Sequence, residues 1–159
     1  MTQSSYRILP YTPSMQPLIE DFCKECFDAL GWTYEPLGRH GDLVNIEKAY
    51  MSQGCFWCMI VDESLVGIVA VHPLDEHHIA AEMKRLYISP RHQGLGYGGV
   101  LFDLAIQYAI DEGYQCIRVD TRRDRAAALR LIEKYGFAEI EKYNNNGFSE
   151  LYFELQLCK

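Results

Sequence analysis

The segment 92–101, HQGLGYGGVL, places four glycines within residues 93–99 and continues directly into an apolar, periodic stretch. Glycine readily adopts left-handed backbone dihedrals and lets a ligand approach the main chain closely. Successive backbone N–H groups ahead of a helix N-terminus attract anions, because the unsatisfied donors and the helix dipole both favour negative charge. The segment therefore predicts a loop that binds a diphosphate through main-chain amides.

Two well-known phosphate-binding loops fit this segment less well. A Walker-type loop needs Gly-Lys followed by Ser or Thr, and the glycines here are not followed by that sequence. The spacing from Gly94 to Gly99 satisfies G-x-G-x-x-G, and Asp120 lies near the position of a ribose-binding acid. However, residues 90–93 separate the glycines from the preceding strand, and residues 121–159 leave little room for further parallel strands. These two features disfavour a dinucleotide-binding fold.

Hydrophobic periodicity and turn residues predict an alternation of strands and helices around the loop. The expected elements, in chain order, are a strand over 6–9, helices over 14–30 and 42–52, strands over 55–62, 65–74 and 81–89, a helix over 98–112, a strand over 114–121, a helix over 125–135, and strands over 137–143 and 148–157. The order is βααβββαβαββ, with a tight hairpin turn at residues 63–64. We therefore expect one α/β domain over residues 1–159.

The segment SPRHQGLGYG resembles the acetyl-coenzyme A loop of the GNAT acetyltransferases. Gln93-x-x-Gly96-x-Gly98 matches the family pattern, and a second register, Arg91-x-x-Gly94-x-Gly96, matches it as well. The strand AEMKRLYI, the VDT after the next strand, the helix end EKYGF and the element order also resemble the family, so the resemblance covers nearly the whole chain. It implies an enzyme that transfers an acetyl group from acetyl-coenzyme A to a primary amine of a small molecule, peptide or protein, by direct attack in a ternary complex.

The GNAT fold that this resemblance implies has a mixed, mostly antiparallel sheet whose parallel central strands splay apart. The pantetheine arm pairs with the main chain in that gap, much as an added strand would. The resemblance assigns the acetyl-coenzyme A contacts to Leu86, Tyr87, Ile88, Gln93, Gly94, Leu95, Gly96, Tyr97, Gly98 and Gly99. A backbone N–H near Tyr87 or Ile88 is expected to polarise the thioester carbonyl, and such a donor supplies roughly 3 to 4 kcal/mol.

Glu82, on the strand that leads into the loop, is the candidate general base. An alkylammonium with a pKa of about 10 is mostly protonated at neutral pH and must lose a proton before it can attack. Members of the family often carry a carboxylate here, which acts directly or through water. The alternative for Glu82 is an ion pair with Lys84, which shares its face of the strand, or with Arg85.

The general acid is the point at which the sequence departs from the family pattern. Ile132 stands where many members carry a tyrosine that protonates the leaving thiolate, and Arg125 stands where an asparagine commonly contacts the cofactor. Tyr135 and Tyr143 are the candidates to replace that acid, although Tyr135 also suits a packing role. A thiol of ordinary pKa, about 8.5, can leave without an acid, so loss of the acid would slow transfer without preventing it.

Composition disfavours several other functions. The net charge of −7 and the sequence pI of about 5.2 disfavour a nucleic-acid partner, which would need a basic face. This acidity is compatible with an amine-bearing substrate, but an acidic surface also serves solubility without any such substrate. No apolar run approaches the length of a membrane span, and the N-terminal MTQSSYRILPY lacks the features of a secretory signal. We therefore expect no membrane partner and a cytoplasmic location.

Two C-x-x-C pairs, Cys23 with Cys26 and Cys55 with Cys58, raise the question of a zinc site. The first pair lies in an amphipathic helical pattern, where cysteine serves as a small buried hydrophobe. The second lies in a strand pattern, where residues three apart point to opposite faces. We therefore expect reduced core thiols and no bound metal.

The sequence leaves the acceptor open. By the family resemblance, residues 31–42, 72–78 and 143–148 flank the cleft, and the acceptor is a small-molecule or peptide amine. The alternative function is a non-catalytic domain that binds acyl-coenzyme A as a sensor, having kept the glycine loop and lost the acid. Dimers are common in the family, and the resemblance allows a homodimer.

Overall fold

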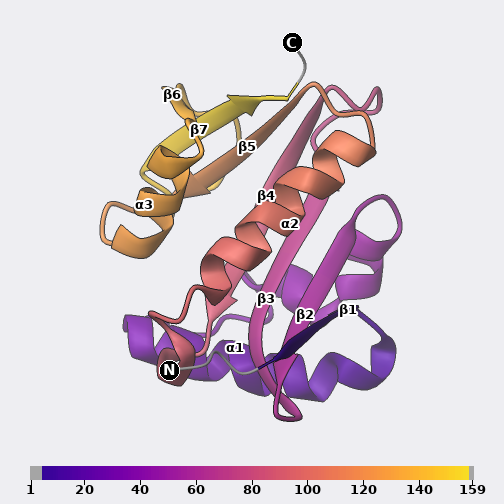
Figure 1. Cartoon of the computed structure of the whole chain (residues 1–159), viewed down its shortest axis with the longest axis vertical. Coiled ribbons are helices and arrows are strands. Elements are labelled where there is room, and N and C mark those ends of the chain that lie inside the picture. Colours follow the sequence, from indigo (N-terminus) through magenta and orange to yellow (C-terminus); the bar gives the residue numbers. More distant parts are fainter. Residues whose placement is uncertain (1–4, 158–159) are drawn as a thin grey trace.

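The computed structural model describes residues 5–157, which form a seven-stranded sheet with helices on both faces (Figure 1). The helices are α1 (Gln16–Leu30), α2 (Tyr97–Asp111) and α3 (Ala126–Lys134). The strands are β1 (Tyr6–Pro10), β2 (Cys55–Val61), β3 (Ser64–Pro73), β4 (Ala80–Ile88), β5 (Cys116–Thr121), β6 (Ala138–Ile140) and β7 (Leu151–Gln156). Their order in the sheet is β1-β2-β3-β4-β5-β7-β6, and every neighbouring pair is antiparallel except β4 and β5. The predicted mixed, mostly antiparallel α/β sheet is therefore confirmed.

β4 and β5 pair over a short stretch before they separate. Ala80–Glu82 of β4 are in register with Cys116–Arg118 of β5, whereas β7 pairs with β5 along its whole length on the other side. Figure 1 shows the two strands diverging from their shared end, with α2 crossing in front of β4. Beyond Glu82, β4 consequently has β3 as its strand neighbour on one side and no strand neighbour on the other, within the described residues.

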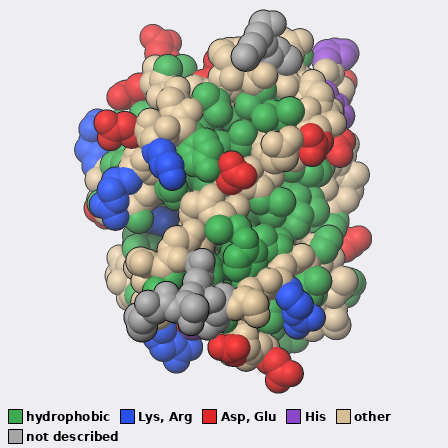
Figure 2. All heavy atoms as spheres, in the orientation of Figure 1, with side chains coloured by type: hydrophobic (Ala, Val, Ile, Leu, Met, Phe, Trp, Pro, Cys, Tyr) green, Lys and Arg blue, Asp and Glu red, His purple; other side chains and the backbone are tan. Residues whose placement is uncertain are grey.

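The sheet separates two hydrophobic clusters, because side chains alternate between the faces of a strand. Trp57 and Met59 of β2 pack with α2 and α3 on one face, whereas Phe56 and Cys58 pack with α1 on the other. Figure 2 shows apolar side chains spread across the face that α2 crosses, with a few acidic side chains among them. Within residues 5–157, no helix combines the length and apolar character needed to cross a membrane.

The second predicted helix, over 42–52, is divided in the structure. A 3-10 helix over Gly41–Val44 and a π-helix over Glu47–Met51 replace it. Asn45 lies between them with φ −142° and ψ 51°, which interrupts helical hydrogen bonding. The first of the two short helices carries Asp42, whose carboxylate pairs with Arg85 of β4 and also accepts a hydrogen bond from Tyr50 of the second. β6 and β7 are also shorter than predicted, because residues 141–150 form a loop.

Candidate active site

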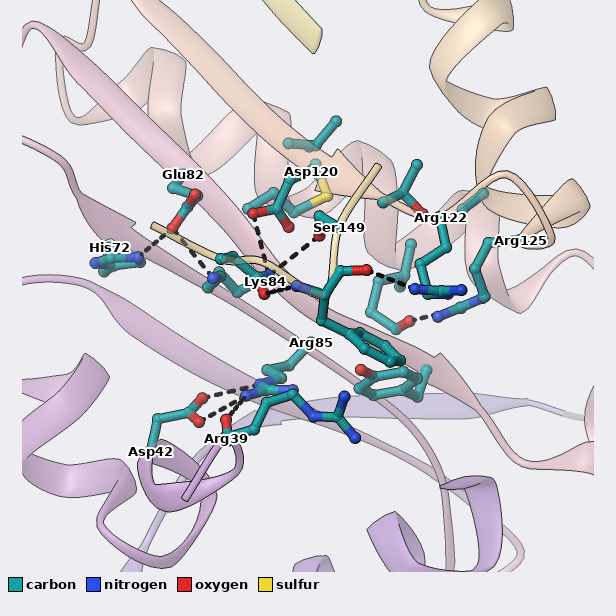
Figure 3. Close-up of a pocket in the computed structure, with 18 of the residues that line it drawn as sticks. Arg39, Asp42, His72, Glu82, Lys84, Arg85, Asp120, Arg122, Arg125 and Ser149 are labelled. Carbon is teal, nitrogen blue, oxygen red and sulfur yellow. Dashed lines mark hydrogen bonds and ion pairs between the residues drawn. The ribbon is translucent and has the colours of Figure 1, made fainter. Parts of the chain in front are cut away.

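A cavity of about 640 Å³ lies in the gap where β4 and β5 separate. Its walls come from β4, from the ends of β3 and β5, from the start of α3, and from the loops after α1 and before β7. The charged side chains are divided around it (Figure 3), with Glu82 and Asp120 on one side, Arg39, Asp42 and Arg85 on the opposite side, and Arg122 and Arg125 on the side of α3. Lys84 lies 3.5 Å from Glu82, so the arginines, and not all of the cations, are set apart from Glu82 and Asp120.

A bulge in β4 shapes this cavity. The register with β3 shifts between Lys84 and Tyr87, so that β4 holds one extra residue there. Arg85, within the bulge, has φ +58°, a left-handed conformation that a non-glycine residue keeps only where its surroundings fix it. Its guanidinium forms a bidentate pair with Asp42, with N–O distances of 2.7 and 2.9 Å. This pair fixes the loop after α1 against β4.

Glu82 is almost completely buried at the point where the strands separate, with an exposed fraction of 3%. One carboxylate oxygen accepts a hydrogen bond from His72 Nε2 at 2.8 Å and lies 3.5 Å from Lys84 Nζ. The other accepts hydrogen bonds from Tyr143 at 2.6 Å and Asn144 at 3.0 Å. Burial by itself would raise the pKa of Glu82, but the hydrogen bonds from His72 and Tyr143 and the charge of Lys84 lower this pKa to about 2. Glu82 is therefore ionised at neutral pH.

His72 is oriented by this carboxylate. Because an ionised carboxylate can only accept hydrogen bonds, Nε2 of His72 must carry the proton that it donates to Glu82. In the neutral imidazole, Nδ1 is then the proton acceptor. His72 lines the cavity, and 28% of its side chain is exposed. Sequence analysis placed His72 only in a segment flanking the cleft, and the signal that identifies it is the hairpin register, which sets it opposite Glu82.

The two tyrosines predicted to replace the general acid lie in different places. The Tyr143 hydroxyl donates to Glu82, and its pKa is raised by burial and by the Glu82 charge. The Tyr135 hydroxyl donates to Asp103 of α2 at 3.1 Å, and its ring packs against Phe102. Neither tyrosine belongs to the described lining of the cavity. The structure thus brings Tyr143 to Glu82 and does not bring Tyr135 there.

The three strand residues expected to contact the cofactor lie along the open side of β4. Leu86 and Tyr87 line the cavity, and Ile88 ends the strand. The Leu86 carbonyl accepts a hydrogen bond from Arg125 Nη2 at 3.3 Å, and the Ile88 carbonyl accepts one from Gln93 Nε2 at 3.1 Å. Both donors are side chains rather than the main chain of a strand. If Arg125 and Gln93 change rotamer, an extended ligand can hydrogen-bond to the two carbonyls in their place.

The glycine loop connects the end of β4 to α2 and lies outside the described lining of the cavity. Gly94 and Gly96 have φ values of +79° and +87°, in the left-handed region that favours glycine. Gly98 and Gly99 belong to the first turn of α2, where N–H groups have no carbonyl partner within the helix. A Cβ on either of these two would lie 3.7 Å from Leu131, so the first turn of α2 lies against α3.

The side chains of the loop residues differ in burial. Leu95 is 45% exposed, whereas the Tyr97 side chain is buried, with its ring edge-to-face against Tyr6. Tyr97 is therefore a core residue, and only its main chain can contribute to a ligand contact. The loop as a whole presents backbone, rather than long side chains, at the N-terminus of α2.

The cysteine pairs are separate from the cavity. Cys23 and Cys26 are buried in α1, and Cys55 and Cys58 lie on β2. Burial raises the pKa of Cys26 and of Cys58 to about 12, so both thiols stay protonated at neutral pH. Across residues 5–157, the His, Cys, Asp and Glu side chains form no group of three or more that could hold a metal ion.

Comparison with protein families gives one domain match. The model of the Acetyltransferase (GNAT) family matches residues 17–137. Human N-acetylaspartate synthetase is 31% identical over 109 residues, which cover 67% of this chain and 36% of that protein. The chain spans about a third to a half of the length of such relatives.

Solved structures share the fold. An acetyltransferase of the GNAT family from Staphylococcus aureus Mu50 has a TM-score of 0.85 at 20% identity, covering 96% of this chain and 99% of that chain. A GNAT family acetyltransferase from Elizabethkingia anophelis with acetyl-CoA bound has a TM-score of 0.68 at 19% identity, covering 98% and 100%. The family model matches well over half of the sequence, and the fold agrees with it. The chain therefore belongs to the GNAT family of acetyltransferases.

Proposed function

We propose that the protein transfers the acetyl group of acetyl-coenzyme A to a primary amine of a small molecule, peptide or protein, by direct attack in a ternary complex. Membership of the GNAT family supports this activity, and one structural observation carries it. Buried Glu82 lies where β4 and β5 part beside a cavity of about 640 Å³. An ionised carboxylate bonded to a histidine, an open strand edge and space for the reacting groups therefore meet at one place.

The residues present fit acetyl-coenzyme A, which supplies an activated acetyl thioester when bound. The left-handed glycines and the first turn of α2 suit its diphosphate. The open edge of β4 over Leu86–Ile88 suits the pantetheine arm, in place of the side chains of Arg125 and Gln93. A backbone N–H near Tyr87 or Ile88 would polarise the thioester carbonyl. The acetyl-CoA-bound relative with the same fold supports this assignment.

In this proposal the acceptor ammonium loses its proton to the His72–Glu82 pair. Glu82, with a pKa of about 2, is by itself a weak base towards an ammonium ion. Nδ1 of His72 takes the proton, directly or through water, and the Glu82 carboxylate stabilises the imidazolium that forms. The amine nitrogen then bonds to the acetyl carbon, the carbon–sulfur bond breaks, and the thiolate leaves and takes up a proton.

We assign Tyr143 a positioning role, because its hydroxyl is committed to Glu82 and its raised pKa makes it a poorer proton donor. Tyr135 is held by Asp103, outside the described lining of the cavity. With an ordinary thiol pKa of about 8.5, the thiolate can leave without a proton from either tyrosine. The reaction is therefore expected to proceed without a dedicated general acid.

A panel of primary amines, assayed with acetyl-coenzyme A, tests this activity. We expect thiol release that depends on the added amine, with the matching acetamide detected by mass spectrometry. Tight binding of acetyl-coenzyme A with no thiol release for any amine would instead identify the alternative function, a non-catalytic acyl-coenzyme A sensor. Failure to bind acetyl-coenzyme A would refute both functions.

We further propose that residues 1–159 act as one domain in the cytoplasm, with no nucleic-acid or membrane partner. The net charge of −7 supports this proposal, because a nucleic-acid site would need a basic face. The frequency of dimers in the family supports a homodimer, which sedimentation equilibrium would test.

A further inference from the structure

The charge of the cavity is opposite to that of the whole chain. The protein has 15 Lys and Arg residues and 22 Asp and Glu residues. The cavity lining, in contrast, contains five of the basic residues and three of the acidic ones. The basic members are Arg39, Lys84, Arg85, Arg122 and Arg125. An acidic protein that gathers cations around one cavity has a site suited to an anionic group.

The carboxylates of the cavity are already engaged by neighbouring groups. Asp42 pairs with Arg85 at 2.7 Å, and Glu82 lies 3.5 Å from Lys84. Asp120, the third, accepts hydrogen bonds from the side-chain amides of two asparagines in the loop before β7. These pairs account for two of the five cations and leave three guanidinium groups without a carboxylate partner from the cavity lining.

Arg39 and Arg122 are the members of this group that have a buried donor without a hydrogen-bond partner within residues 5–157. The Nε–H groups of both are buried and have no hydrogen-bond partner among the described residues. Their carboxylate neighbours are exposed ones, Glu35 at 3.1 Å from Arg39, and Asp124 and Glu150 at 3.7 and 3.8 Å from Arg122. Exposed ion pairs of this kind contribute little energy. Two guanidinium groups with spare donors suit a carboxylate, which accepts several N–H bonds at once.

Phe148 holds these two side chains at the cavity. The guanidinium carbons of Arg39 and Arg122 lie 3.8 and 4.4 Å from the centre of its ring, within the range of cation–π contacts. Arg122 also donates to the Phe148 carbonyl at 2.6 Å. The backbone N–H of Phe148 donates to the Asn146 side chain, which in turn donates to Ser149. This loop is therefore fixed internally, and the stack joins the loop after α1 to the end of β5.

We propose that the acceptor is a zwitterionic amine, an amino-acid-like molecule whose carboxylate binds Arg39 and Arg122 while its amino group faces Glu82 and Asp120. This inference rests on the proposed function and names the substrate class of the same site. Figure 3 shows Glu82 and Asp120 across the cavity from Arg39, with Arg122 on the α3 side. That separation fits a molecule with opposite charges at its two ends. An amine without a carboxylate leaves the buried donors unpaired, and a site of that kind rejects it.

Matched acceptors test the proposal. L-Phenylalanine and 2-phenylethylamine, and L-leucine and isoamylamine, differ within each pair only in the carboxylate. We expect kcat/KM to be about 100-fold or more higher for each amino acid than for its partner.

Arg39→Gln and Arg122→Gln should each raise KM for the amino acids about tenfold or more, with KM for the two simple amines and Kd for acetyl-coenzyme A unchanged. Arg123→Gln, an exposed neighbour outside the cavity lining, is the matched control and should behave as the parent.

Two results would overturn the proposal. One is an equal kcat/KM for both members of each acceptor pair. The other is a loss of acetyl-coenzyme A affinity in Arg39→Gln and Arg122→Gln that equals the loss for the amino acid, since the guanidinium groups would then serve the phosphates of the cosubstrate.

A binding measurement distinguishes this proposal from the proposed function. Equilibrium dialysis of labelled N-acetyl-L-leucine, with coenzyme A present, reports the carboxylate site without turnover. Binding that Arg39→Gln weakens, in a protein that acetylates no amine, would refute the transferase activity and support the carboxylate site. Turnover with no preference for a carboxylate would refute the site alone.

Discussion

Both oxygens of the Glu82 carboxylate accept hydrogen bonds, from His72 on one and from Tyr143 and Asn144 on the other. A carboxylate held in this way stays ionised and fixes the neighbouring imidazole, but it has little tendency to take a proton from an ammonium ion. His72 is the more exposed of the pair, with 28% of its side chain accessible against 4% for Glu82. In the proposed mechanism, His72 is therefore the proton acceptor and Glu82 supports it.

Replacement of His72 by Gln should lower kcat by about 100-fold or more, the range typical for loss of a general base, with little change in Kd for acetyl-coenzyme A. Glu82→Gln should also lower kcat, because an amide cannot stabilise the imidazolium as a carboxylate does. Steady-state kinetics and calorimetric titration of the cosubstrate measure these effects.

His77 provides the matched control, because it is a histidine exposed in the turn before β4. His77→Gln should keep the kcat of the parent. A normal kcat in His72→Gln would exclude that imidazole as the base, and a normal kcat in Glu82→Gln would exclude the pair.

From the sequence, Glu82 is the candidate base because its strand leads directly into the glycine loop, and the alternation of that strand predicts its neighbour Lys84, which lies 3.5 Å away. The sequence does not predict that His72 donates to Glu82. A strand pattern indicates which face a residue occupies, whereas the residue opposite depends on the register of the hairpin. The proximity of Arg39 and Arg122 was harder still to predict from the sequence. They belong to loops that are distant in sequence, and they meet only because both pack against Phe148.

At the scale of elements, the start of α2 depends on the left-handed backbone conformation of Gly96, its N-cap residue. It has φ +87° at the start of the helix, and Gly113 has φ +86° just beyond the other end. Gly96→Val should weaken acetyl-coenzyme A binding about tenfold or more, because the side chain disfavours the left-handed conformation and obstructs the approach of a diphosphate to the amides. Isothermal titration calorimetry gives this Kd.

Gly113→Val is the control for the same backbone strain at the opposite end of the helix. A Cβ there meets no atom within 4 Å, so the substitution should lower the melting temperature much as Gly96→Val does while leaving Kd unchanged. If both variants bind acetyl-coenzyme A as tightly as the parent, the loop does not hold the diphosphate.

At the scale of elements, alternation and helical periodicity sufficed for the sheet strands and the three long helices, because both signals are local. They did not suffice for residues 42–52, where the extended φ of −142° at Asn45 divides the segment into two short helices. The loop before β7 was also partly assigned to strands. There, Asn144 and Asn146 accept hydrogen bonds from backbone N–H groups two residues ahead, and such turns compete with strand pairing.

For the whole molecule, the depressed pKa of Glu82 links folding stability to acid. This pKa is about 2 in the folded protein, against an ordinary value of 4.5. The contribution of Glu82 is therefore present above pH 4.5 and is lost as the pH falls towards 2, and it amounts to about 3 kcal/mol. Glu82→Gln should lose correspondingly less stability than the parent over this interval. Urea unfolding followed by circular dichroism at a series of pH values measures the difference.

Glu139 supplies the control for acid stability, because it is an exposed carboxylate on β6. Glu139→Gln should follow the parent curve throughout. Parallel curves for Glu82→Gln and the parent would show that the hydrogen bonds to Glu82 do not stabilise its ionised form.

The short pairing of β4 with β5 has a consequence for the tendency of the protein to self-associate. An unaccompanied strand edge is a template on which a foreign chain can add its own strand. Here side chains, those of Arg125, Gln93 and Cys26, donate hydrogen bonds to the carbonyls of Leu86 and Ile88 along that edge. A pantetheine arm lying in the gap would shield the edge from such addition. The supply of the acyl donor would then also protect the folded protein from self-association.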